Sequence, residues 1–502
     1  MMRNPPTLNP HVDLLERFRA CARLHPNRVA HRSADRSLTY AELASGIDAT
    51  AALIWSQLSP DGSPVVIVGH KEPEMLMGFL GSVQAGHPYI PLDTSLPAKR
   101  IEQIIASSGA RLVLTPQRVG EAIDRTPRAK RRPEASIDAD AAFYIIFTSG
   151  STGTPKGVTI TLDNLTGFVD WMRREQDFQP GGETFLNQAP FSFDLSVMDT
   201  YSSLTTGGTL VSLTAREIET PRLLFDTLRS SGITTWVSTP SFANWCLAQR
   251  DWDARMLPRL RRFLFCGETL PIALAGELLE RFPDAAVWNT YGPTEATVAT
   301  TSIRIRPSIL SHYATLPVGA PRPGTRIVLV DAVGQYLAAE GASGEIIIAG
   351  RNVSPGYLNQ PDLTSARFFD FEGQRAYRTG DIGHFEDGLL FFDGRVDDQI
   401  KLNGYRIELG DVESNIRALP EVREAIVVPV ERDGRVESLI GFVATDVLTP
   451  GETDFQTSQR LRRALFERVP AYMVPRTLRR VERWPLTPNG KVDRRALARL
   501  AP

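Results

Sequence analysis

Short apolar runs alternate with longer amphipathic segments through the first part of the chain. Five of these runs have the length and the aliphatic or aromatic composition of buried strands. They occupy residues 64–70, 110–116, 141–147, 208–213 and 234–240. Between the first two runs, residues 73–86 (PEMLMGFLGSVQAG) place apolar side chains at helical spacing. Strands that alternate with helices in this way indicate an α/β fold with largely parallel sheets.

The texture of the sequence changes near residue 317. Shorter strands separated by turns follow, among them RIVLVD, GEIIIAG and GLLFFDG, so a β-rich subdomain is expected over about 317–396. A charged, hinge-like stretch begins after Gly394, and residues 397–502 have helix and strand patterns of their own. We therefore expect a large N-terminal region, residues 1–396, and a small α+β C-terminal domain, residues 397–502.

Length and composition support a globular enzyme with more than one domain. The chain has 502 residues, too many for a single hydrophobic core, and 42% of them are apolar. The formal net charge is -2, so no strong field would collect nucleic acid or an anionic membrane. The basic run at residues 128–132 is interpreted as a solvated loop.

Cysteine and histidine usage argues against a disulfide framework or a metal cage. The three cysteines, Cys21, Cys246 and Cys266, lie far apart, and the seven histidines show no paired-ligand spacing. The N-terminal segment lacks the apolar centre of a secretion signal, and no stretch approaches the roughly 18 apolar residues of a membrane span. We expect a cytoplasmic protein that neither binds nucleic acid nor inserts into a membrane.

Residues 147–158, FTSGSTGTPKGV, gather glycines, hydroxyl side chains and one lysine at the end of a predicted strand. A loop of this kind between a strand and a helix can aim backbone amides at phosphate oxygens. Asp163 or Asn164 is expected to cap the helix that follows the loop. The loop is not a Walker A motif, because Lys156 follows Pro155 and no hydroxyl residue comes after it.

The loop TSGSTGTPKG resembles the phosphate loop of the adenylate-forming superfamily, which includes acyl-CoA synthetases, luciferases and amino-acid adenylation domains. Further segments resemble motifs of that superfamily in the same order along the chain. They are FSFDLSVMD (191–199), NTYGPTEAT (289–297), YRTGDIG (377–383), FDGRVDDQIKLNGYRIELGDVE (392–413) and PLTPNGKVDRRAL (485–497). The resemblance implies an adenylate-forming N-terminal domain, with two α/β subdomains beside the β-rich one, and a mobile C-terminal domain.

The resemblance also implies ATP-dependent activation of a carboxylic acid, in which the acid attacks the α-phosphate and pyrophosphate leaves. Cations and oriented amides must offset the negative charge on both reactants. The positions that match the superfamily's ATP-binding motifs are Thr148, Ser149, Gly150, Ser151, Thr152, Lys156, Asn289, Thr290, Tyr291, Gly292, Pro293, Thr294, Asp381, Phe392, Asp393, Gly394, Arg395 and Lys491.

Five positions carry specific expectations by this resemblance. Tyr291 offers an aromatic face for adenine, and Asp381 is expected to accept the ribose hydroxyls. Glu295 is the expected ligand of Mg²⁺, which prefers oxygen ligands. Lys491, one of only six lysines, is the expected catalytic lysine on the mobile domain, and Asp397 matches the hinge position.

Asp194 determines which class of acid is expected. Amino-acid-activating members of the superfamily hold the substrate ammonium with an aspartate at this position; the alternative is that Asp194 only caps the helix that follows. Lys491 is expected to contact the acid as well. The other pocket positions carry no second charge, which suits a small aliphatic amino acid. They are Leu195, Met198, Val237, Leu264, Cys266, Thr290, Val298 and Ala299.

The local strings around this pocket are most similar to the D-alanine:D-alanyl carrier protein ligases, which load a carrier protein for D-alanylation of teichoic-acid-type cell-wall polymers. No GGxS attachment site occurs in the sequence, so the phosphopantetheine thiol is expected on a separate carrier protein. One alternative is an adenylation enzyme that loads L-alanine or proline in secondary metabolism. An acyl-CoA synthetase, disfavoured by Asp194, and a non-catalytic nucleotide-binding regulator are more distant alternatives.

Overall fold

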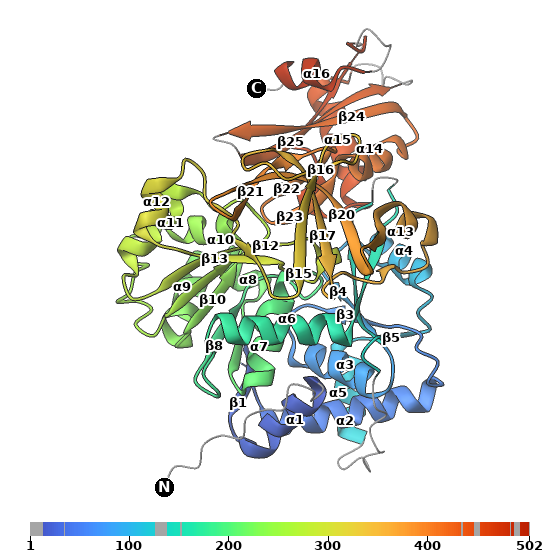
Figure 1. Cartoon of the computed structure of the whole chain (residues 1–502). Helices are drawn as coiled ribbons and strands as arrows, with labels where there is room; N and C mark the ends of the chain where they lie inside the picture. Colours follow the sequence, from blue (N-terminus) through green and yellow to red (C-terminus); the bar gives the residue numbers. More distant parts are fainter. Residues whose placement is uncertain are drawn as a thin grey trace. The chain divides into compact units, whose positions relative to one another are not determined.

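The computed structural model of the chain is shown in Figure 1. It describes residues 14–34, 36–125, 138–150, 153–432, 435–445, 452–481, 483–485 and 492–500. Residue contacts divide the chain into two compact units. The large unit comprises Met1–Asp93, Gly109–Ile146 and Val158–Gly394. The small unit comprises Thr94–Ser108, Phe147–Gly157 and Arg395–Pro502, so it combines the phosphate loop with the C-terminal part of the chain.

The first sheet of the large unit has nine strands, and its centre is parallel. Antiparallel strands close both edges. In spatial order the strands are β14 (Ala320–Pro321), β13 (Thr301–Ile305), β12 (Ala286–Tyr291), β11 (Arg262–Phe265), β10 (Thr235–Ser238), β8 (Thr184–Asn187), β9 (Thr209–Ser212), β1 (Val29–Ser33) and β2 (Arg36–Thr39).

A second sheet and a β-rich sheet complete the strands of the first 394 residues. The second sheet has the order β18 (Gly356–Tyr357), β7 (Lys156–Thr161), β6 (Ala142–Thr148), β4 (Tyr89–Asp93), β3 (Val65–Gly69) and β5 (Leu112–Leu114). The β-rich sheet has the order β16 (Tyr336–Leu337), β15 (Thr325–Val330), β17 (Gly344–Gly350), β20 (Gln374–Glu386) and β19 (Phe368–Phe371), and β21 (Leu389–Arg395) pairs with β20.

The helices of the large unit bury apolar faces against these sheets. Helix α3 (Pro73–Gln84) is buried along almost its whole length and contacts α2 (Tyr40–Gln57) and α5 (Pro116–Arg125). The remaining helices are α1 (Leu14–Leu24), α6 (Leu162–Glu175), α7 (Leu195–Thr206), α8 (Ala215–Glu219), α9 (Pro221–Ser231), α10 (Pro240–Cys246), α11 (Ile272–Arg281), η1 (Thr294–Ala296), α12 (Pro307–His312) and α13 (Pro361–Arg367).

The small unit has its own core, built from residues such as Ile407, Val412, Ile416 and Leu461. Its helices and strands are α4 (Ala98–Ser108), β22 (Gln399–Leu402), β23 (Tyr405–Glu408), α14 (Leu409–Arg417), β24 (Val422–Arg432), β25 (Arg435–Thr445), α15 (Asp454–Phe466), η2 (Ala471–Met473), β26 (Thr477–Arg480) and α16 (Arg494–Leu500). A separate apolar core is what allows such a unit to form a distinct domain.

The five strands expected from apolar runs are confirmed as β3, β5, β6, β9 and β10, and the helix expected at 73–86 is α3. The expectation for the segment after the phosphate loop was wrong. Strand β7 intervenes between the loop and α6, so the loop does not lead directly into a helix. The helix cap is Thr161, which accepts from the Asn164 backbone N–H while the Asn164 side chain accepts from the Thr161 N–H.

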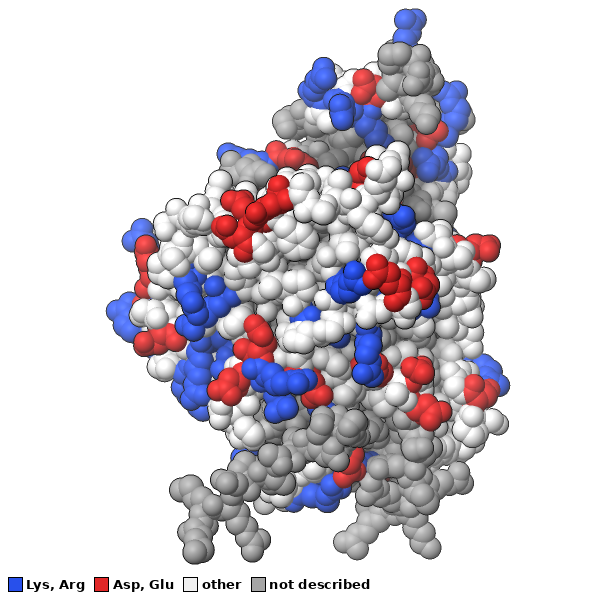
Figure 2. Space-filling model, viewed as in Figure 1, with Lys and Arg blue, Asp and Glu red and all other residues white. Residues whose placement is uncertain are grey.

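The charged side chains of the surface agree with the small net charge of the chain. On the face shown in Figure 2, basic and acidic side chains lie interspersed. Within the described ranges, no helix combines the length and apolar character needed to cross a bilayer. The basic run at 128–132 lies outside the described residues.

Candidate functional site

Two of the predicted nucleotide-binding residues meet in the large unit. Tyr291 ends β12, and its hydroxyl donates to Asp381 Oδ2, on β20, at 2.6 Å. Both side chains are buried, and the ring centroids of Tyr291 and Phe392 lie 6.3 Å apart. The Asp381 backbone N–H donates to Thr379 Oγ1 at 2.9 Å, at the place where the pairing of β20 with β17 is irregular. An aromatic ring and a carboxylate are thus held next to each other, an arrangement that can bind a nucleoside.

The other predicted residues of β12 secure the strand to its neighbours. Asn289 donates to the Pro317 carbonyl and Thr290 to the Phe265 carbonyl, each at 2.8 Å. At Gly292 an added Cβ would lie 2.7 Å from the Ala299 Cα, so this position excludes a side chain. The chain therefore folds back on itself directly after Tyr291.

Thr297 and Val298, on this returning segment, have strained backbones. Their φ angles are 63° and 65°, a left-handed conformation that β-branched residues rarely adopt. Thr297 Oγ1 donates to the Asn352 carbonyl at 2.7 Å, and Cys266 Sγ lies 3.6 Å from the Val298 carbonyl. Cys266 and Val298, both predicted pocket residues, are therefore in contact.

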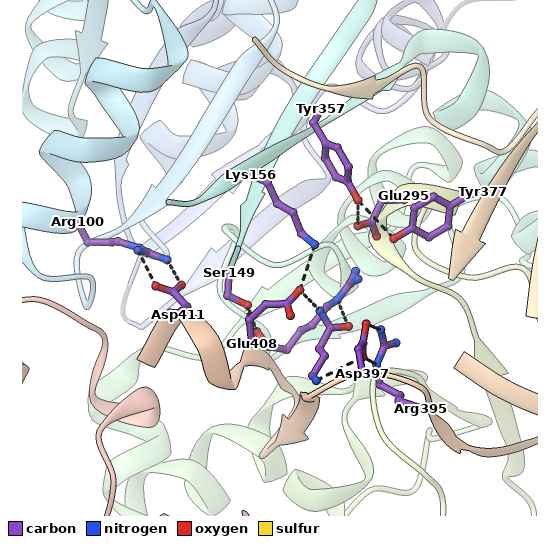
Figure 3. A network of polar contacts seen from close by, with 12 residues as sticks. Arg100, Ser149, Lys156, Glu295, Tyr357, Tyr377, Arg395, Asp397, Glu408 and Asp411 are labelled. Atoms are coloured by element: carbon purple, nitrogen blue, oxygen red, sulfur yellow. Dashed lines mark hydrogen bonds and ion pairs between the residues drawn. The ribbon is translucent and has the colours of Figure 1, made fainter. Parts of the chain in front are cut away.

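Glu295 lies in η1 and is fully buried. Its Oε1 accepts from the Tyr357 hydroxyl at 2.8 Å, and the Tyr357 and Tyr377 hydroxyl oxygens lie 3.4 Å apart (Figure 3). In the part of the chain that the structure describes, no group of three or more His, Cys, Asp or Glu side chains could hold a metal ion. One buried carboxylate fits Mg²⁺, which proteins commonly bind through one or two carboxylates together with substrate phosphates.

Asp194 lies at the start of α7 and is half-buried. Its side chain makes no capping hydrogen bond, which counts against the alternative that it serves only to cap the helix. Among the residues that the structure describes, the buried Tyr144 hydroxyl has no hydrogen-bond partner. Burial, and to a lesser extent Tyr89 and Asp194, raise the pKa of Tyr144 well above its usual value. The other predicted pocket residues are all buried: Leu195, Met198, Val237, Leu264, Cys266, Thr290, Val298 and Ala299.

In the small unit, side chains of the loop at residues 147–158 form hydrogen bonds with residues of β23 (Figure 3). Ser149 Oγ donates to the Arg406 carbonyl at 2.9 Å and accepts from the Glu408 N–H at 3.1 Å. Lys156 Nζ lies 3.2 Å from Glu408 Oε1, and both side chains are largely buried. Gly150 is required at the turn, because an added Cβ would lie 2.1 Å from the Thr154 carbonyl oxygen. The loop's lysine and one of its hydroxyls are thus both engaged by residues 406–408.

A buried ion pair supports the same loop. Arg100, on α4, pairs with Asp411, on α14, at 2.7 Å, and also donates to the Gly153 carbonyl at 3.2 Å. Burial raises the pKa of Asp411, and Arg100 opposes that rise. Sequence reasoning missed Arg100, Glu408 and Asp411, because no local pattern shows which distant segment an arginine or a carboxylate contacts.

The remaining predicted residues are distributed over both units, and in the sequence the large unit ends at Gly394. In the large unit, Asp393 Oδ1 and His384 Nδ1 lie 2.9 Å apart. In the small unit, Arg395 donates to both carboxylate oxygens of Asp397, at 2.7 and 2.9 Å. Thr148 ends β6, and Pro293 and Thr294 follow β12. Ser151, Thr152 and Lys491 lie outside the described residues.

Comparison with known proteins gives matches over most of the chain. Residues 18–358 match the family described as AMP-binding enzyme, and residues 411–491 match the AMP-binding enzyme C-terminal domain. The D-alanine--D-alanyl carrier protein ligase of Bacillus licheniformis is 45% identical, over 97% of this chain and 99% of the relative. The protein of the same name from Bacillus velezensis is 46% identical over the same shares.

Two solved structures are similar along almost the whole chain. The Vibrio cholerae adenylation domain AlmE, in complex with glycyl-adenosine-5'-phosphate, superposes with a TM-score of 0.84 at 22% identity, covering 100% of this chain and 99% of that one. Holo-PA1221, an NRPS protein containing adenylation and PCP domains, gives a TM-score of 0.81 at 29% identity, covering 98% and 85%. These matches confirm the expected α/β fold with a large N-terminal and a small C-terminal domain, and the resemblance drawn from the motifs.

Proposed function

Because the chain belongs to the AMP-binding enzyme family, we propose that it activates a small amino acid with ATP and loads it onto a carrier protein. Asp194 supports this proposal most directly. Among the predicted pocket residues that the structure describes, it is the only carboxylate, and it lies at the start of a buried helix. A carboxylate in that setting attracts an ammonium group by about 4 kcal/mol at 4 Å before desolvation is subtracted.

The proposed amino acid is D-alanine. The uncharged lining suits a methyl side chain, and the two Bacillus relatives bear the name D-alanine--D-alanyl carrier protein ligase. The proposed acceptor is a phosphopantetheine thiol on a separate carrier protein, in a pathway of cell-wall polymer D-alanylation. Because the reaction consumes ATP, we place it in the cytoplasm.

The proposed ATP site combines residues that recognise each part of the nucleotide. The Tyr291 ring would stack on adenine, and Asp381 would accept the ribose hydroxyls. The triphosphate would lie against the loop residues 148–152 and Lys156, with the Thr294 hydroxyl near the α-phosphate. Glu295 would hold Mg²⁺, which, when bound, neutralises charge on the phosphate oxygens.

Two steps make up the proposed reaction. In the first, a carboxylate oxygen of the amino acid attacks the α-phosphorus, a new P–O bond forms, and pyrophosphate leaves with the electrons of the broken bond. Lys491 would stabilise the charge that develops there. In the second, the carrier thiolate attacks the acyl carbon and AMP leaves. The domain of residues 397–502 would rotate between the steps about Asp397.

Substrate preference tests the proposal directly. In amino-acid-dependent ATP–pyrophosphate exchange, D-alanine is expected to give the highest kcat/KM in a panel that includes L-alanine, glycine, serine and L-proline. One methylene contributes only about 1–3 kcal/mol of discrimination, so slower exchange with neighbouring amino acids is expected. Equal or better exchange with L-proline would refute D-alanine as the substrate, and no exchange with any amino acid would refute the activity.

Glu408→Gln is expected to strengthen ATP binding. In the structure Lys156 is paired with Glu408, so the triphosphate must displace this carboxylate to use the lysine. The substitution removes one charged hydrogen bond, between Lys156 and residue 408, from the ATP-free protein, which corresponds to about a tenfold lower Kd for ATP. The Kd is measured by isothermal titration calorimetry. Glu424→Gln is the control, because Glu424 pairs with Arg417 at 3.0 Å in the same unit without contacting the loop. An unchanged Kd for Glu408→Gln would show that the pair does not compete with ATP.

A further inference from the structure

Lys71 follows β3, and its ammonium group is enclosed within the large unit, with the residue only 1% exposed. Nζ donates to Asn187 Oδ1 at 2.5 Å and to the Ala189 carbonyl. It also lies 4.4 Å from the centroid of the Phe191 ring. All three contacts are made to one short segment, residues 187–191, at the beginning of the connection from β8 to α7.

A buried carboxylate balances this ammonium group. Asp199, on α7, is fully buried, and its Oδ1 accepts from Asn187 Nδ2 at 2.9 Å. Burial lowers the pKa of Lys71 to about 8 and raises the pKa of Asp199, and the opposite charge of the partner counteracts both shifts. Asn187 therefore stands between the two groups, with its carbonyl turned to the lysine and its amino group to the carboxylate.

Two further side chains fix the orientation of Asn187. Ser212 Oγ donates to Asn187 Oδ1 at 2.7 Å, and His31 Nε2 lies 2.9 Å from Ser212 Oγ. Burial, followed by the charges of Lys71 and Arg36, lowers the pKa of His31 to about 3, so the imidazole is neutral. These hydrogen-bonded side chains include one cation, Lys71, and one anion, Asp199, and they connect the segment after β3 with β1, β8, β9 and α7.

We infer that Lys71 is a positioning residue for the amino-acid subsite, an inference that rests on the proposed function. Asp194 lies between the two parts of the chain that this network holds. Before it, the ammonium of Lys71 binds Asn187, Ala189 and Phe191; after it, α7 carries Asp199. The position of the Asp194 carboxylate is therefore set through Lys71, which itself does not touch the substrate.

A lysine is suited to this task because one group supplies several donors to a carbonyl and an amide at the same place. An apolar residue could fill the space but would leave the Ala189 carbonyl and Asn187 Oδ1 without this donor. Since displacement of a positioning group by about 1 Å can lower a rate by about a hundredfold, a loosened Asp194 should affect the amino acid and spare ATP. It should also weaken the choice between enantiomers, which depends on where the ammonium is held.

The test uses Lys71→Met and the double variant Lys71→Met/Asp199→Asn. The double variant removes both charges, so it also decides the question if the single variant fails to fold around an uncompensated carboxylate. The matched control is Arg17→Met/Asp170→Asn, which removes another buried pair of the large unit, with a 2.5 Å contact between α1 and α6. For each protein the KM for D-alanine, the KM for ATP and the ratio of kcat/KM for D-alanine to that for L-alanine are measured by pyrophosphate exchange, beside the melting temperature.

In the Lys71 variants the KM for D-alanine is expected to rise at least tenfold and the D-to-L ratio to fall severalfold. The KM for ATP should stay within twofold, and the control should keep the wild-type ratio. A folded double variant with the wild-type KM for D-alanine and D-to-L ratio would overturn the inference, as would an equal rise of both KM values. Failure of the wild-type enzyme to activate any amino acid would instead refute the proposed function, so the two failures are distinguishable.

Discussion

Replacement of Asp194 by asparagine is expected to raise the KM for D-alanine by about a hundredfold or more, because removing one partner of a desolvated charge pair costs about 2–5 kcal/mol. Asp194 is half-buried at the start of α7, and the other predicted pocket residues that the structure describes carry no carboxylate. Asparagine keeps the size of the side chain and removes only its charge. The measurement is ATP–pyrophosphate exchange at saturating ATP, with the amino acid varied.

Two controls separate loss of the charge from general damage. The Kd for ATP should not change in Asp194→Asn, because the Tyr291 and Asp381 contact is independent of this position. Asp163→Asn, which removes a carboxylate paired with the exposed Arg351, should leave exchange with D-alanine intact. The Asp194→Asn substitution should reduce exchange with an acid that lacks an ammonium group, such as propionate, much less than it reduces exchange with D-alanine. If D-alanine and propionate were affected equally, Asp194 would not be the ammonium ligand.

The local parts of this fold could be predicted from sequence because their signals are local. A run such as PVVIVGH contains the apolar, β-branched side chains of a buried strand, and β3 forms there. The cap of α6 was mispredicted because Thr161, Asp163 and Asn164 can each cap a helix, and only the intervening strand β7 shows that the helix starts at Leu162. Where several neighbouring residues could each cap a helix, the tertiary structure determines which of them does so.

In the candidate site, too, local motifs could be predicted from the sequence, whereas contacts between distant segments could not. Motif order predicted Tyr291, Glu295 and Asp381 as site residues, but the hydrogen bond between Tyr291 and Asp381 joins strands of different sheets and depends on the packing of the large unit. The Lys71 network was missed because a lysine after a strand is normally a solvated charge. The low lysine content of the chain was a usable signal, since a chain that places arginine at most cationic positions keeps lysine where a compact ammonium is needed.

Lys491→Ala is expected to lower the rate of adenylate formation by about a thousandfold while ATP still binds, because removal of one preorganised charge at the reacting phosphate has an effect of that order. Lys491→Arg should not restore the rate, since a planar guanidinium does not reproduce the point charge of an ammonium. Adenylate formation is measured as pyrophosphate released in a single turnover, and ATP binding by calorimetry. Lys99→Ala, at an exposed position of α4, is the control and should react normally.

A second measurement on the same variant distinguishes the two half-reactions. When chemically prepared D-alanyl adenylate is supplied, Lys491→Ala should transfer D-alanine to the phosphopantetheinylated carrier at a rate close to that of the wild type, because the thiol step proceeds without attack at phosphorus. Loss of both half-reactions would mean that the substitution disturbs the C-terminal domain as a whole. Normal pyrophosphate release would show that charge at the α-phosphate is stabilised by another cation of the site, for which Lys156 and Arg395 are the candidates that the motifs supply.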